Sequence, residues 1–127
     1  MFSHVVVGTN DLKKAKRFYD AVLGSLGYGE GLIRDAGGYL YVADNSFFIV
    51  TGPLDGQAAT HANGGTIGFT CRSTDQVDLW HAAGVANGGK SVEDPPGVRE
   101  TPAVALYLAY LRDPDGNKLC ALYRIRA

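Results

Sequence analysis

The feature that most constrains this chain is an internal repeat with an offset of 62 residues. Each copy begins with a short apolar segment, at 4–7 and again at 66–69, and continues into a polar cap, a helical pattern and a glycine. At the same offset Phe18 aligns with Trp80. A long unit that occurs only twice indicates a duplicated module rather than a solenoid, which needs at least three repeats to be stable.

Each copy of the repeat predicts one amphipathic helix. In the first copy the polar segment 9–11 supplies acceptors for free helix N–H groups, and apolar residues then recur at helical spacing. In the second copy Ser73 and Gln76 have the spacing of a capping box ahead of Val77 and Trp80. The apolar stripe of the first helix comprises Leu12, Ala15, Phe18, Tyr19, Val22 and Leu26.

After each helix the period becomes strand-like, so each half is predicted to be a βαβββ module in an α+β fold. Strands are expected at 31–36, 39–43 and 47–50 in the first half and at 90–93, 106–112 and 118–124 in the second. The last two are joined by the turn 113–117, where Pro114 presets φ and Gly116 takes a positive φ. The division is module one at 1–52, a connection at 53–64 and module two at 65–127 of a single domain.

Length and charge limit the classes of function. The 127 residues fit one compact domain, and 12 basic against 13 acidic side chains give a net charge of -1, which argues against nucleic-acid binding. No apolar run approaches the roughly 20 residues of a membrane helix, and no export signal opens the chain. Two cysteines, Cys71 and Cys120, are too few for a disulfide scaffold. We therefore expect a cytoplasmic globular protein with no membrane partner.

Four segments carry a resemblance to the vicinal oxygen chelate superfamily. They are 2–7, 10–12, 64–69 and, most specifically, the Arg-Asp-Pro-Asp-Gly-Asn-Lys-Leu segment at 112–119. This superfamily includes glyoxalase I, extradiol dioxygenases, fosfomycin-resistance transferases and bleomycin-resistance proteins, and the chain resembles its glyoxalase-like branch over essentially its whole length. The resemblance implies two tandem βαβββ modules that form a curved mixed sheet around a cleft, with a divalent metal on the concave side.

The resemblance also implies where metal ligands would lie, namely on the first and last strands of each module. Those positions are His4, Thr66 and Cys120, with Phe48 as the equivalent position on the last strand of module one. His4 and a Cys120 thiolate would make only two good ligands, whereas catalytic zinc usually has three. We expect that the cleft has lost its metal and that no cofactor is bound. A residual site for zinc, nickel or manganese remains the alternative.

Strand alternation predicts which other residues line the cleft, because every second side chain projects to one face. His4 should share its face with Val6, and the opposite face should pack beneath the helices through Val5, Val7, Ile67 and Phe69. The proline-rich segment 93–102 is expected to be a loop that covers the cleft. The predicted ligand-binding residues are His4, Val6, Phe48, Val50, Thr66, Gly68, Thr70, Cys120, Leu122 and Arg124.

Two functions remain open at this point. One is a lactoylglutathione lyase-like enzyme with a degraded metal site and His4 as the candidate catalytic residue. The other is a metal-free protein that sequesters a hydrophobic or aromatic small molecule, as bleomycin-resistance proteins do. An extradiol dioxygenase would need two His and one carboxylate, of which only His4 is present. Many relatives are homodimers, so a homodimer is also possible.

Overall fold

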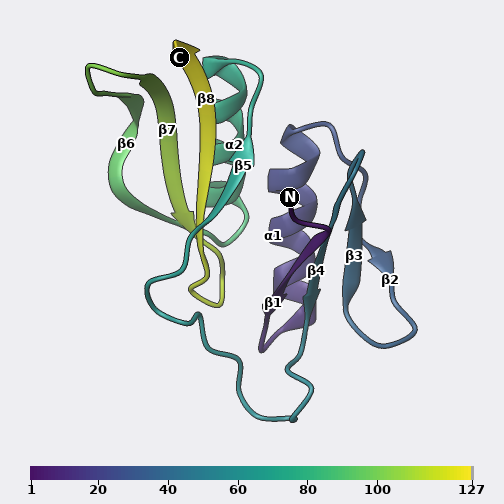
Figure 1. The fold of residues 1–127 in the computed structure, drawn as a ribbon. Helices are drawn as coiled ribbons and strands as arrows, with labels where there is room; N and C mark the ends of the chain where they lie inside the picture. Colours follow the sequence, from purple (N-terminus) through teal and green to yellow (C-terminus); the bar gives the residue numbers. More distant parts are fainter. Residues whose placement is uncertain (127) are drawn as a thin grey trace.

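The computed structural model describes residues 1–126 and confirms both βαβββ modules. Each module forms its own four-stranded mixed sheet, sheet A in the order β1-β4-β3-β2 and sheet B in the order β5-β8-β7-β6 (Figure 1). β1 runs parallel to β4, and β5 runs parallel to β8. The elements in chain order are β1 (His4–Gly8), α1 (Leu12–Ser25), β2 (Leu32–Ile33), β3 (Tyr39–Val42), β4 (Phe47–Thr51), β5 (Ile67–Thr70), α2 (Thr74–Ala86), β6 (Lys90–Glu100), β7 (Ala105–Arg112) and β8 (Lys118–Arg126).

Both helices begin at the caps that the sequence predicts. The Asp11 side chain accepts a hydrogen bond from the backbone N–H of Lys14 at 3.1 Å, and Ser73 accepts one from that of Gln76 at 3.0 Å. Gln76 Oε1 in turn accepts from the N–H of Arg72, the residue before the cap, so side chains on both sides of the helix start bond to the backbone there. Within residues 1–126, neither helix has the length and apolar composition needed to span a bilayer.

The two helices pack against each other, and each covers one face of the sheet in its own module. Gly84 of α2 allows the close approach to α1, because a Cβ there would lie 3.2 Å from Cγ1 of Val22 and 3.3 Å from Cε1 of Phe18, and it would also clash with Leu111 of β7. Phe18 and Trp80, the pair aligned by the repeat, are both fully buried in this shared core. The opposite face of each sheet carries no helix, and we call these the open faces of sheets A and B.

Two strands depart clearly from the prediction. β2 is limited to Leu32–Ile33 instead of the expected 31–36, and β6 is longer than expected. The segment 93–102 was expected to be a loop, but β6 runs to Glu100 and pairs with β7 on both sides of a bulge between Val92 and Gly97. Pro95 and Pro96 lie within this bulge, where no ladder N–H is required, so the prolines interrupt the strand without ending it.

A buried carboxylate in the turn 113–117 joins the two modules. Asp113 is 4% exposed, and its Oδ2 accepts hydrogen bonds from Tyr19 Oη of α1 at 2.5 Å and from Asn117 Nδ2 at 2.8 Å. Asn117 Nδ2 also donates to the carbonyl of Gly8 in β1 at 3.1 Å. Gly116 has φ +93°, which lets the turn close. Since an unpaired buried carboxylate is strongly unfavourable, these bonds fix how module two sits on module one.

Removal of the Tyr19 hydroxyl should weaken this junction. Tyr19→Phe leaves a buried Asp113 oxygen with one donor fewer, so we expect the free energy of unfolding to fall by about 1–3 kcal/mol. Tyr28→Phe is the control, because no hydrogen bond of the Tyr28 hydroxyl is found among residues 1–126. Denaturant titration monitored by circular dichroism measures both, and equal losses in the two variants would contradict the role of Tyr19.

Candidate functional site

The open face of sheet A is apolar and partly exposed. The parallel register of β1 and β4 sets His4 beside Phe47 and Val6 beside Ile49. The His4 and Phe47 rings are stacked with their centroids 4.8 Å apart and their planes 2° from parallel. Val6 is 50% exposed. The members of this face are His4, Val6, Leu32, Leu40, Val42, Phe47 and Ile49.

The prediction that Phe48 and Val50 share the face of His4 is wrong. Phe48 pairs with Val5, and its ring lies 4.8 Å from that of Tyr19 on the helix side of sheet A. Val50 is fully buried in the same core. The error is a shift of one residue, which exchanges the two faces of a strand. Aligning the two hairpins through Asn45 and Asn117 made Phe48 the counterpart of Cys120. The register makes Ile49 the counterpart instead, because Ile49 pairs with Val6 as Cys120 pairs with Gly68.

The open face of sheet B combines an apolar floor with basic side chains. β5 and β8 pair Gly68 with Cys120 and Thr70 with Leu122, so these four predicted residues share this face. Arg124 follows on the same side of β8 and is exposed. Thr66 lies before β5 begins and is also exposed. The remaining members are Lys90, Val92, Gly97, Arg99, Leu106, Leu108, Tyr110, Arg112 and Lys118.

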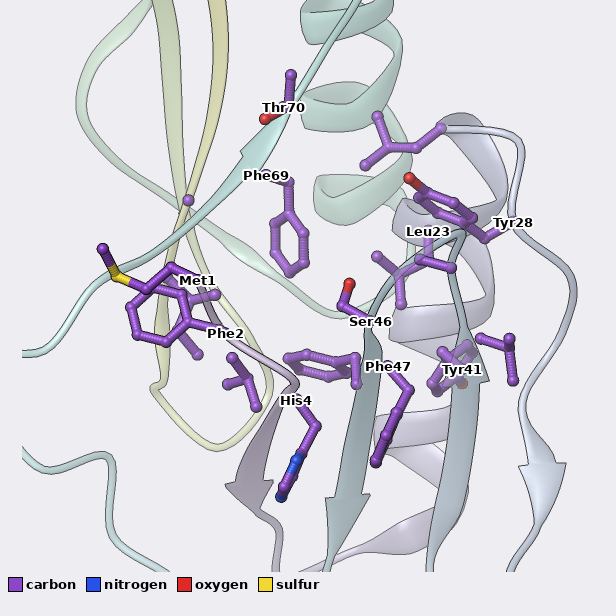
Figure 2. A pocket seen from close by; sticks show the side chains of 17 residues that line it. Met1, Phe2, His4, Leu23, Tyr28, Tyr41, Ser46, Phe47, Phe69 and Thr70 are labelled. Atoms are coloured by element: carbon purple, nitrogen blue, oxygen red, sulfur yellow. The ribbon is translucent and has the colours of Figure 1, made fainter.

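A cavity of about 330 Å³ lies between the two modules (Figure 2). It is bounded by both modules, because β4 and the end of α1 supply one wall and β5 supplies the other. Of the predicted site residues, the cavity brings together His4, Phe48, Gly68 and Thr70. The predicted residues that do not line it are Val6, Val50, Thr66, Cys120, Leu122 and Arg124.

Several residues that line the cavity were not predicted. Phe69 was expected to pack beneath the helices. Its ring centroid does lie 5.9 Å from that of Phe48 and 6.4 Å from that of Trp80, but Phe69 also borders the cavity. Strand alternation assigns a side chain to one face and cannot detect a gap between two sheets. The other unpredicted lining residues are Met1, Phe2, Val5, Leu23, Leu26, Tyr28, Tyr41, Val42, Ala43, Ser46, Phe47 and Ile67.

Comparison with solved structures decides the family. A glyoxalase/bleomycin resistance protein from Albidiferax ferrireducens T118 is 55% identical over 97% of this chain and 98% of its own, with a TM-score of 0.93. The chain belongs to the glyoxalase/bleomycin resistance protein family. No family model matches the sequence, and no curated protein matches it.

More distant structures share the fold of this glyoxalase/bleomycin resistance protein. A glyoxalase/bleomycin resistance protein/dioxygenase family enzyme from Burkholderia phytofirmans PsJN is 21% identical over 95% of this chain and 96% of its own, with a TM-score of 0.72. A lactoylglutathione lyase from Agrobacterium tumefaciens is 19% identical over 97% of this chain and 92% of its own, with a TM-score of 0.66. At these identities the likeness concerns the fold alone.

The implied ligand positions offer few donor groups for a divalent metal: one imidazole, one neutral hydroxyl and one thiol. His4 Nδ1 is within 2.7 Å of Ser3 Oγ, and the side chain beside its ring is Phe47, which has no donor atom. Thr66 offers a neutral hydroxyl. Among residues 1–126, no three His, Cys, Asp or Glu side chains gather in a group that could hold a metal ion. The fourth position, Cys120, is a buried free thiol.

Burial also makes both thiols poor ligands and poor nucleophiles. It raises the pKa of Cys71 to about 11, and it raises the pKa of Cys120 above the usual range for a thiol. Since the thiolate is the form that binds metals and attacks electrophiles, both cysteines are neutral at physiological pH. Cys120 Sγ contacts the carbonyl of Ala121 at 3.5 Å, which is consistent with a packed, protonated side chain.

Thiol labelling should reveal this protonation state. At about pH 8 Cys71 of the native protein should react with DTNB at least about 100-fold more slowly than in the unfolded protein, because a pKa of about 11 leaves very little thiolate. The rate should rise as the pH approaches that pKa. Cys120 should also react more slowly, because burial raises its pKa as well. Thr60→Cys, at an exposed position of the connection, is the reactive control. Rapid labelling of Cys120 in the native protein would contradict the buried, neutral thiol.

Proposed function

We propose that the protein is a metal-independent member of the family that binds an apolar or aromatic small molecule in the cavity between its modules. The observation that carries the proposal is the cavity itself, with a volume of about 330 Å³ and walls from both modules. Ligand sites of this size are typically apolar with a few polar groups. We place the protein in the cytoplasm, where reducing conditions suit its two free buried thiols.

Several aromatic side chains line the cavity and favour a planar ligand. Phe47, Phe48 and Phe69 contribute rings from both modules, and Tyr28 adds a ring from the end of α1 (Figure 2). Aromatic pairs gain energy from offset-stacked and edge-to-face contacts in addition to their burial. His4, already stacked on Phe47, supplies an imidazole at the wall of the cavity, and we assign it to ligand contact by hydrogen bonding or stacking.

A lactoylglutathione lyase-like activity is the alternative, and the site gives it less support. In that chemistry a metal polarises a carbonyl group and a carboxylate moves the proton. The positions His4, Thr66 and Cys120 provide neither three metal ligands nor a carboxylate. Turnover of the methylglyoxal–glutathione hemithioacetal by the purified protein would favour the lyase over the binding protein.

Binding of the neutral fluorophore N-phenyl-1-naphthylamine tests the proposed function. We expect its fluorescence to rise on titration with the protein and the affinity to be unchanged by excess EDTA. Gly68→Phe should weaken binding at least about tenfold, because the new ring occupies the cavity. The substitution should leave the fold intact, since a Cβ at Gly68 meets no atom within 4 Å and its φ is not in the left-handed region.

Val98→Phe on β6 is the control for this experiment. It adds a ring at a position that is 55% exposed and does not line the cavity, so it should bind the fluorophore as the unmodified protein does. No fluorescence response, or an affinity abolished by EDTA, would overturn the metal-independent binding function.

We further propose that the protein is a homodimer in which a second copy covers the part of the open face of sheet A that does not line the cavity, around Val6 and Leu32. This face is a continuous row of uncharged side chains, and Leu32, Val6 and Val42 are 56%, 50% and 57% exposed. Contiguous apolar patches on soluble proteins usually mark an interface. β1 is also an edge strand, so its outer backbone groups have no partner strand within residues 1–126.

Light scattering coupled to size-exclusion chromatography measures the assembly. We expect twice the chain mass of 13.5 kDa for the protein and a shift toward the single-chain mass for Val6→Lys, which introduces a charge into the covered face. Leu79→Lys on α2, at a position that is 62% exposed, should leave the dimer unchanged. A single-chain mass at all concentrations would contradict the dimer.

A further inference from the structure

The open face of sheet B collects positive charge on one side of a nearly neutral protein. Five of the twelve Lys and Arg residues lie on it, and the net charge of the whole chain is only -1. The sheet A face that contributes to the cavity has no Lys, Arg, Asp or Glu. The five basic residues are Lys90, Arg99, Arg112, Lys118 and Arg124.

Two of these basic residues stand on either side of one apolar side chain. Arg99 of β6 pairs with Leu106 of β7, and Leu106 pairs with Arg124 of β8. Paired residues of antiparallel strands project to the same face about 5 Å apart, so the two arginines begin about 10 Å from each other above Leu106. Long guanidinium side chains at that separation can reach a common ligand atom or two oxygens of one acid group.

The cross-strand row of Arg99, Leu106 and Arg124 connects to the cavity through apolar neighbours. The adjacent row of sheet B runs from Leu108 through Leu122 to Thr70, which lines the cavity. Arg124 is two residues beyond Leu122 on β8 and therefore lies diagonally across from Thr70, about 7–8 Å away. A ligand with its rings in the cavity can extend over Leu122 and bring a polar end to the arginines.

The charges of these two arginines are not neutralised by carboxylates. The Arg99 guanidinium donates to the backbone carbonyls of Asp94, Pro95 and Gly97, at 3.0–3.1 Å, and these bonds hold the β6 bulge but leave the positive charge in place. Arg124 has no hydrogen-bond or ion-pair partner among residues 1–126. The acidic residues of the bulge are Glu93 and Asp94, and Glu93 forms an ion pair with Lys118.

We propose that the natural ligand is an organic anion, with an apolar or aromatic body in the cavity and an acid group bound by Arg124 and Arg99. This assignment rests on the proposed binding function and adds the ligand class. Arginine suits the role because its planar fork of N–H donors matches a carboxylate, sulfonate or phosphate group. Leu106, Leu108 and Leu122 exclude water beneath the contact and strengthen the charge-assisted hydrogen bonds.

Two fluorophores that differ in a single group test the ligand class. 8-Anilino-1-naphthalenesulfonate is N-phenyl-1-naphthylamine with an added sulfonate, so the ratio of their dissociation constants isolates the acid group. We expect the sulfonate to bind about tenfold more tightly. Arg124→Met and Arg99→Met should each weaken the sulfonate about three- to tenfold and leave the neutral fluorophore unchanged.

Three comparisons keep the outcome unambiguous. Lys14→Met, on an exposed position of α1, removes the same charge elsewhere and should leave both affinities unchanged. Gly68→Phe should weaken both fluorophores if they share the cavity. Arg124→Met is the decisive variant, because Arg99 also holds the bulge whereas Arg124 is exposed. Equal affinities for the two fluorophores, or a sulfonate affinity insensitive to Arg124→Met, would overturn the anion assignment while neutral binding would still support the cavity.

Discussion

The buried carboxylate of Asp113 is the interaction on which the arrangement of the two modules depends. Its oxygens accept from the Tyr19 hydroxyl of module one, from the Asn117 amide, and from the backbone N–H groups of Asp115 and Asn117. Burial raises the pKa of Asp113, and the hydrogen bonds from Tyr19 and Asn117 oppose that rise. A buried carboxylate with this many donors holds the turn in one position, and through Tyr19 it holds the turn against module one.

The packing of α1 on α2 explains why one face of each sheet is left open. Each helix lies between its own sheet and the other helix, so all the helical cover of the protein is on the inner side of the sheets. The outer side of sheet A is left apolar and that of sheet B is left basic with an apolar floor. The two open faces therefore follow from how a duplicated βαβββ unit packs on itself, and they differ in chemistry because the residues on each face differ.

Features that depend on short stretches of sequence were predicted correctly, whereas the faces of side chains that depend on strand register were not. The repeat, both helix caps and the positive φ of Gly116 follow from short-range patterns, and the structure confirms them. The faces of Phe48 and Val50 depend on which residue of β4 pairs with β1, and a shift of one residue was enough to reverse them. A cleft was predicted, but most of the residues that line the cavity were not, because the cavity depends on how the two modules lie relative to each other and strand alternation treats each module separately.

The junction at Asp113 has a consequence for the two halves of the repeat. The turn at 113–117 must keep its carboxylate and amide, because it holds the modules together. The corresponding turn of module one, at 44–46, does not form this junction, and its Ser46 borders the cavity. The duplicated hairpins have thus diverged, since one holds the modules together and the other borders the cavity. If the cavity binds a ligand as proposed, mutations that alter ligand preference are expected to accumulate in the first hairpin, while the second tolerates few changes.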